Sequence, residues 1–196
     1  LVGSEMCIRD RCISVNDEIV HGIGSSRVIQ PGDIIKLDVG IIKDGWVGDN
    51  ALTVPVGNVG REIEDLLIAT EESLHIAISF ARDGVMLGDL CASIERHVRS
   101  KGYSVVREFV GHGVGKKLHE PPQVPNYRPE SNRPRLRSGM ILAIEPMVNL
   151  GKAGIKMLDD DWTVVTADGG PSSHFEHTVL VTEDEPEILT WRERTM

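Results

Sequence analysis

Four acidic side chains stand singly inside runs of apolar, strand-forming residues, and no other feature constrains the fold of this chain as strongly. They are Asp38, Asp49, Glu145 and Glu176. A carboxylate buried in a sheet without a partner costs free energy. Convergent carboxylates, in contrast, can share protons or hold cations. For the first two acids alone, exposed strand positions are the plainer interpretation, but four isolated strand acids favour a shared site.

The register of one hairpin decides whether Asp38 and Asp49 meet. Two β-rich runs, 34–42 and 46–54, are joined by Lys43-Asp44-Gly45, a strong hairpin signal. A four-residue loop makes the two acids direct cross-strand neighbours, and a tight two-residue turn makes them diagonal neighbours on one face, with Cβ atoms roughly 5 to 8 Å apart. A three-residue loop would place them on opposite faces.

The remaining patterns alternate between helix and strand and predict a single α+β domain. An amphipathic helix is expected over 61–82, with Asp83-Gly84 as its stop, and a second runs from Asp89 as N-cap to Lys101. Five prolines between Glu120 and Pro134 argue against regular structure there. Residues 167–173 are expected to form a turn. Further strands are predicted over 103–110, 140–148, 162–166, 175–182 and 187–190.

Composition narrows the classes of function. The chain has 196 residues, of which 40% are hydrophobic, enough for one domain with a buried core. A net charge of −9 argues against a nucleic-acid partner, and the four arginines in 128–137 are interpreted as a solvated loop. No apolar run reaches the roughly 18 to 20 residues of a membrane helix, and no secretory signal is recognised. Three cysteines without a CxxC pair suit a reducing compartment, so we expect a cytoplasmic protein.

The first eleven residues show neither helical nor strand periodicity. The stretch Met6 to Arg11 resembles the translation of a transposon-end adapter used in sequencing libraries. We therefore expect residues 1–11 to be a non-native scar, a genuine irregular arm being the alternative. On this interpretation the natural sequence enters at about Cys12, and the domain over 12–196 is truncated at its N-terminus.

A histidine adds a different type of donor to the four acids. His112 lies between two glycines in the stretch Gly111 to Gly115. Imidazole is a common metal ligand, and the glycines let the backbone approach a bound group closely. Alone, a histidine in a glycine-rich loop carries little weight. The stretch is not a phosphate loop, because no Gly-Lys-Ser/Thr follows.

Taken together, these residues resemble the methionine aminopeptidases of type I, the bacterial type. The motifs are Ser14 to Gly22, Gly111 to Gly115 and His119-Glu120-Pro121-Pro122, combined with Asp38, Asp49, His112, Glu145 and Glu176 in that order. The resemblance covers Cys12 to Thr190. Only 32 residues separate His112 from Glu145, as in the compact type I enzymes. It implies the pita-bread fold, in which pseudo-twofold βααβ halves surround a central antiparallel sheet, with the first half incomplete here.

The resemblance also implies a metal centre with two divalent ions. Asp38 would chelate one ion, and His112 and Glu145 would bind the other. Asp49 and Glu176 would bridge both. Four carboxylates balance two divalent cations, and a donor set rich in oxygen favours Co, Mn or Fe(II), with Zn possible. Two such ions would activate a hydroxide that attacks the scissile carbonyl.

Further residues acquire roles only through the resemblance. Glu145, His21 and His119 would act in catalysis, with both histidines also contacting the substrate. Residues matching the methionine pocket are Cys12, Leu118, Trp162 and Phe175. Gly24 stands where the family usually has proline, which loosens the loop that carries His21.

The implied activity is removal of the initiator methionine from nascent chains, with a preference for small second residues. We expect a monomer that acts near the ribosome, with no nucleic-acid or membrane partner. The nearest alternative is an Xaa-Pro aminopeptidase or prolidase, which shares the five ligands. A metal-free binding protein of the same fold is a third possibility, but such relatives usually lose ligands, and all five are present.

Overall fold

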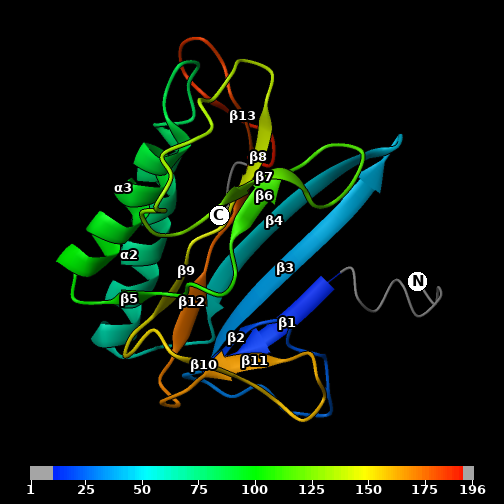
Figure 1. Cartoon of the computed structure of the whole chain (residues 1–196). Coiled ribbons are helices and arrows are strands. Elements are labelled where there is room, and N and C mark those ends of the chain that lie inside the picture. Colours follow the sequence, from blue (N-terminus) through cyan, green and yellow to red (C-terminus); the bar gives the residue numbers. More distant parts are fainter. Residues whose placement is uncertain (1–10, 192–196) are drawn as a thin grey trace.

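The computed structural model describes residues 11–191, in which two helices back a set of antiparallel strands (Figure 1). The helices are α2 (Arg61–Ile78) and α3 (Leu87–Ser100). They pack on each other and against the strands of the C-terminal half, while the long hairpin of β3 (Ile34–Lys43) and β4 (Trp46–Pro55) runs along the other side. The α+β prediction is confirmed. Neither helix is long and apolar enough to cross a membrane.

Within residues 11–191 the strands form four small sheets, and all paired strands are antiparallel. One sheet has the order β1-β3-β4, with β1 at Arg11–Val15. A second joins β10 (Ile155–Met157), β11 (Val164–Thr166) and β2 (Glu18–Val20), and a third joins β12 (Ser172–His174), β9 (Met147–Asn149) and β5 (Ser104–Val105). The largest has the order β14 (Glu187–Ile188), β13 (His177–Leu180), β8 (Ile141–Ile144), β6 (Gly111–Gly113) and β7 (Glu120–Val124).

The hairpin has the tight-turn register. Lys43 pairs with Trp46 across Asp44 and Gly45, whose φ angles of 52° and 79° are those of a two-residue turn. Asp38 pairs with Ala51, and Asp49 pairs with Gly40. The two acids are therefore diagonal neighbours on one face, which was one of the two favourable alternatives.

The helices differ from prediction at their ends. Helix α2 stops at Ile78, before the predicted end at Arg82, because the chain tightens into short-range bonds from Phe80 and Ala81 back to residues 77 and 78. Asp89 is not the N-cap of α3, which begins at Leu87 after Met86. Asp89 instead lies in the first turn, where a carboxylate favours the positive end of the helix dipole.

Several strand predictions need correction. Residues 120–124 form β7 despite their prolines, because β7 is an edge strand and a proline there need not donate to a neighbour. The predicted strand over 140–148 is broken at Glu145-Pro146 into β8 and β9. The expected turn over 167–173 ends in the first residues of β12. The strands expected over 103–110, 162–166, 175–182 and 187–190 are shorter, being β5, β11, β13 and β14.

The segment predicted to be foreign lies almost wholly outside the described residues. Its last residue, Arg11, begins β1 and pairs with Val39, so that residue belongs to the sheet.

A buried lysine ties the hairpin to the C-terminal half. Lys36 is among the largest fully buried side chains, and its Nζ donates to the carbonyls of Asn16, 2.6 Å away, and Ser172, 3.0 Å away. Burial lowers the pKa of its ammonium to about 7. These bonds connect β3, the turn before β2, and β12, and so fix the base of the strands that carry the acids.

Candidate active site

Five predicted donors arrive from five segments that are distant in sequence. Asp38 is on β3, Asp49 on β4 and His112 on β6, while Glu145 follows β8 and Glu176 precedes β13. In the sheet, His112 pairs with Ala143 and His177 pairs with Ile144. These pairings align His112, Glu145 and Glu176. Strand pairing therefore brings His112, Glu145 and Glu176 together at one sheet, and Asp38 and Asp49 together in another.

Bonds between β4 and the second half fix the position of Asp49. Its backbone N–H donates to Thr178 Oγ1 at 2.9 Å, and that hydroxyl donates to the Asp49 carbonyl at 2.7 Å. The Glu176 N–H donates to the Ala51 carbonyl at 2.8 Å. Both acids are thus held through their main chains, and the Asp49 carboxylate also accepts a hydrogen bond from the Asn50 N–H, 3.1 Å away.

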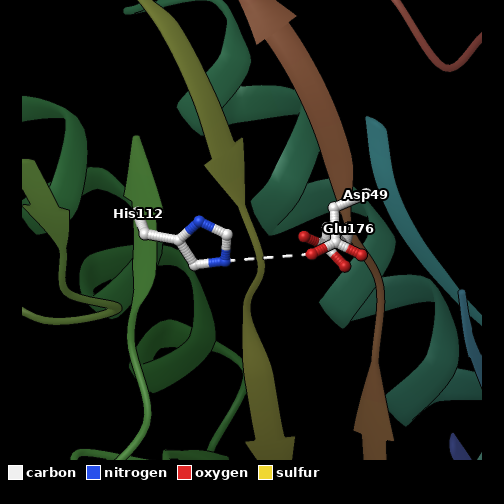
Figure 2. Close-up of side chains that lie close together, drawn as sticks. All are labelled: Asp49, His112 and Glu176. Carbon is white, nitrogen blue, oxygen red and sulfur yellow. Dashed lines mark ion pairs between the residues drawn. The ribbon is translucent and has the colours of Figure 1, made fainter. Parts of the chain in front are cut away.

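Asp49, His112 and Glu176 form the candidate metal-ligating group. One ligand atom from each lies within 4.8 Å of the other two, and all three residues are buried. Figure 2 shows the His112 ring pointing from β6 toward both carboxylates, with Nε2 3.9 Å from Asp49 Oδ2. The other ring nitrogen, Nδ1, lies 3.0 Å from the Gly113 carbonyl. Donation from Nδ1 to that carbonyl would leave Nε2 free to bind a cation, as is common for metal-ligating histidines.

Glu145 and Asp38 adjoin this group. Glu145 Oε1 lies 3.5 Å from His112 Nε2. Burial is the main cause that raises the pKa of the Asp38 carboxyl to about 6, and the nearby carboxylates of Asp49 and Glu145 raise it further. The structure therefore places all five predicted donors in one electrostatic neighbourhood.

The electrostatics of these five residues are better satisfied with a bound cation than without one. Burial, followed by neighbouring carboxylates, raises the pKa of both Glu145 and Glu176 well above the usual range. Glu176 Oε1 is buried and has no hydrogen-bond partner in the described part of the chain. Such a group is costly unless a positive charge or a proton compensates it. A divalent cation would satisfy the orphaned oxygen and neutralise the crowded carboxylates.

The two histidines predicted to contact substrate have different aromatic neighbours. The His119 ring centroid is 4.3 Å from that of His112. His21, which has a φ of 62°, stacks on Trp162 with ring centroids 4.6 Å apart and meets the edge of Phe109 at 5.4 Å. Phe109 was not predicted, because one aromatic residue in an apolar run gives no signal of such a contact.

The predicted pocket residues occupy different environments. Cys12 is buried and pairs with Asp38 across β1 and β3, and burial, then Asp38, raises the pKa of its thiol to about 11. Phe175 belongs to the main core cluster. Leu118 is exposed and lies beside Gly40. Gly40 is the residue that pairs with Asp49 across β3 and β4.

His174 was not predicted from the sequence. This residue is 1% exposed, and its Nε2 lies 3.6 Å from Glu145 Oε2. Burial lowers the pKa of the imidazole. The one available signal was its spacing, since in an extended segment His174 and Glu176 would share a face.

Comparisons with known proteins agree with this geometry. The profile of metallopeptidase family M24 matches residues 10–183. The chain is 51% identical over 179 residues to methionine aminopeptidase 1 of Bacillus subtilis (strain 168), an alignment that spans 91% of this chain and 72% of that protein.

Solved structures extend the likeness to the fold. The crystal structure of a methionine aminopeptidase from Thermotoga maritima matches with a TM-score of 0.90 and 45% identity, over 93% of this chain and 74% of that one. A prolidase from Pyrococcus furiosus matches with a TM-score of 0.76 over 94% of this chain and 50% of that one, but at 24% identity this likeness concerns the fold alone. The predicted pita-bread fold is confirmed.

Proposed function

Because the chain belongs to metallopeptidase family M24, we propose that it is a methionine aminopeptidase, which hydrolyses the first peptide bond of new proteins to release the initiator methionine. The observation that carries this proposal is the convergence of Asp49, His112 and Glu176 on one point. The similarity to the Bacillus subtilis enzyme favours methionine removal over the other activities of the fold.

The proposed centre holds two divalent ions. Asp38 would bind one, His112 and Glu145 the other, and Asp49 and Glu176 both. When bound, the ions would supply a water of lowered pKa and polarise the scissile carbonyl. The donor set, mostly oxygen with one imidazole, favours Co, Mn or Fe(II), with Zn possible.

The chain's own groups would orient the substrate around this centre. His119, whose ring lies beside that of His112, would donate a hydrogen bond to the carbonyl oxygen as negative charge develops. His21, held by its stack on Trp162, would face the leaving amide. The carboxyl of Glu145, which lies 3.5 Å from His112 Nε2, would hold a proton during transfer.

The methionine side chain would enter an apolar pocket. Its proposed walls are Cys12, Leu118, Trp162 and Phe175, where a thioether can contact apolar and aromatic groups. The substrates would be the N-terminal methionines of nascent chains with small second residues. We further propose that residues 12–196 form one catalytic domain, preceded by a non-native segment, and act as a cytoplasmic monomer near the ribosome.

A peptide assay tests the proposed activity against prolidase-like activity. Chelator-stripped protein, reloaded with Mn(II) or Co(II), is given Met-Ala-Ser and Ala-Pro-Ser, and the released amino acids are quantified. We expect cleavage of Met-Ala-Ser only, and a fall of more than about 100-fold in the Asp49→Ala variant, since loss of a direct ligand should exceed the loss of a supporting contact. Preferential cleavage of Ala-Pro-Ser would favour prolidase activity instead.

A further inference from the structure

His174 is a buried imidazole whose polar atoms lack partners. Among the described residues, neither Nδ1 nor Nε2 accepts or donates a hydrogen bond. Buried polar groups in native proteins are nearly always hydrogen-bonded, so an exception calls for a specific explanation. No part of the activity proposed above uses this residue.

The backbone of His174 holds the ring in place. Its N–H donates to Thr53 Oγ1 at 2.9 Å, and the same hydroxyl donates to its carbonyl at 2.7 Å. On the other side, His174 pairs with Met147 between β12 and β9. Because both flanks of the strand are fixed, the ring cannot move toward solvent without breaking these contacts.

The ring lies on one side of the Glu145 carboxylate, and His112 lies on the other. Glu145 Oε1 is 3.5 Å from His112 Nε2, and Glu145 Oε2 is 3.6 Å from His174 Nε2. The two oxygens of one carboxylate therefore face different imidazoles. A closure of a few tenths of an ångström would bring His174 Nε2 into ordinary hydrogen-bond range of Oε2.

We propose that His174 is a positioning residue for Glu145, an inference that rests on the proposed function. Its Nε2–H donates to Oε2 and so directs Oε1 toward the cation that Glu145 would share with His112. Supporting partners of this kind orient metal ligands and tune their affinity. His174 is assigned as a donor and not as a ligand, because its Nε2 lies 3.6 Å from Oε2 of Glu145, an oxygen that can accept a hydrogen bond from it.

Calorimetry of Mn(II) binding to the chelator-stripped full chain tests this assignment. His174→Phe keeps a ring but has no nitrogen, and His174→Gln restores an N–H donor. We expect the phenylalanine variant to weaken one binding step by about 10- to 100-fold and the glutamine variant to stay within a few-fold of the wild type. His75→Leu, which removes an exposed imidazole from α2, is the matched control and should bind as the wild type does.

Circular dichroism establishes that each variant is folded, and His174→Leu replaces the phenylalanine variant if that one is not. The assignment is overturned if the variant without ring nitrogens binds Mn(II) as tightly as the wild type, or if glutamine restores nothing. A Co(II) absorption spectrum that changes in the glutamine variant would make His174 a ligand and also overturn it. A wild type that binds no Mn(II) would overturn the proposed function as well.

Discussion

Two threonine hydroxyls join the hairpin to the C-terminal half, and each serves one residue of the site. Thr178 bonds both the N–H and the carbonyl of Asp49, and Thr53 does the same for His174. Both threonines are buried. Because each hydroxyl acts as donor and acceptor at once, a side chain of equal volume without the oxygen cannot replace it.

Thr178→Val should lower the free energy of unfolding by about 1–3 kcal/mol, because the Asp49 N–H and carbonyl lose buried partners while packing volume is conserved. Urea denaturation of the metal-free protein measures the change. Thr182→Val, which removes a hydroxyl bonded to Glu185 in an exposed setting, should stay within about 0.5 kcal/mol of the wild type. Equal effects of the two substitutions would show that the bonds to Asp49 do not matter.

At the residue scale, the sequence indicated side chains that converge in the structure, but not the residues that support them. Asp38 and Glu176 could be predicted because a lone acid in an apolar strand requires an explanation. Thr178 and Thr53 could not, since a hydroxyl is ordinary in a strand and its partner is set by tertiary packing. His174 was hidden in the same way, because only the fold brings it beside Glu145.

Strand β6 depends on the absence of side chains on both sides of His112. A Cβ at Gly111 would lie 2.3 Å from the Ala143 carbonyl oxygen, and one at Gly113 would lie 2.3 Å from that of Pro121. Both neighbours are backbone atoms of the adjacent strands β8 and β7. The glycines therefore let β6 fit between them, which is a stronger requirement than the close approach to a ligand that the sequence suggested.

Gly113→Ala should push β6 away from β7, displace His112 and weaken Mn(II) binding, with a loss of stability of about 1–3 kcal/mol from overpacking. Calorimetry and urea denaturation measure the two effects. Gly24→Ala is the matched control, because nothing lies within 4 Å of an added Cβ there. Unchanged metal affinity in Gly113→Ala would refute the link between this strand and the site.

The loop before β3 is fixed by Asp33, whose carboxylate accepts hydrogen bonds from the Gln30 N–H and Asn16 Nδ2, each at 2.8 Å. The bond from Gln30, followed by that from Asn16, lowers the pKa of this carboxyl. A pKa lowered on folding contributes stability that is complete above the unfolded value, about 3.9, and is lost as the pH falls through the folded value. Asp33→Asn should therefore lower the urea midpoint at pH 6, and the difference from wild type should shrink at pH 3. A difference that widens in acid would contradict the assignment.

Elements were predictable where local chemistry sets them. The Asp44-Gly45 turn fixes the hairpin, and its register follows from the turn type. Strand β7 was missed because its edge position, which makes prolines tolerable, is a property of the sheet and not of the segment. The break between β8 and β9 lies at Glu145-Pro146. It was not predicted, because the apolar pattern continues on both sides of these two residues.

At the scale of the whole molecule, one face of the β1-β3-β4 sheet is apolar and open. Ile13, Val39, Ile41 and Leu52 are between 37% and 60% exposed. Ile13, Leu37 and Leu52 lie opposite one another, and Val39 and Ile41 alternate with Asp38 along β3, so they point away from the site. Helices α2 and α3 cover a different part of the strands (Figure 1). Open apolar surface of this kind promotes association.

Replacing Val39 and Ile41 together by threonine should reduce concentration-dependent light scattering, because it lowers the hydrophobicity of this face while retaining β-branched side chains. Mn(II) affinity should not change, since the substituted side chains are on the opposite face from Asp38. The paired substitution Ile68→Thr and Ile76→Thr on α2, which also removes two isoleucines, is the comparison. Equal scattering by the wild type and the Val39 and Ile41 variant would refute the role of this face.

The most direct measurement is anomalous X-ray diffraction at the manganese edge from crystals of the full chain grown with Mn(II). We predict anomalous density within coordination distance of Asp49, His112 and Glu176, and none there in crystals of Asp49→Ala. Density confined to other places, or a wild-type site that stays empty at saturating Mn(II), would contradict a metal-dependent peptidase centred on these residues.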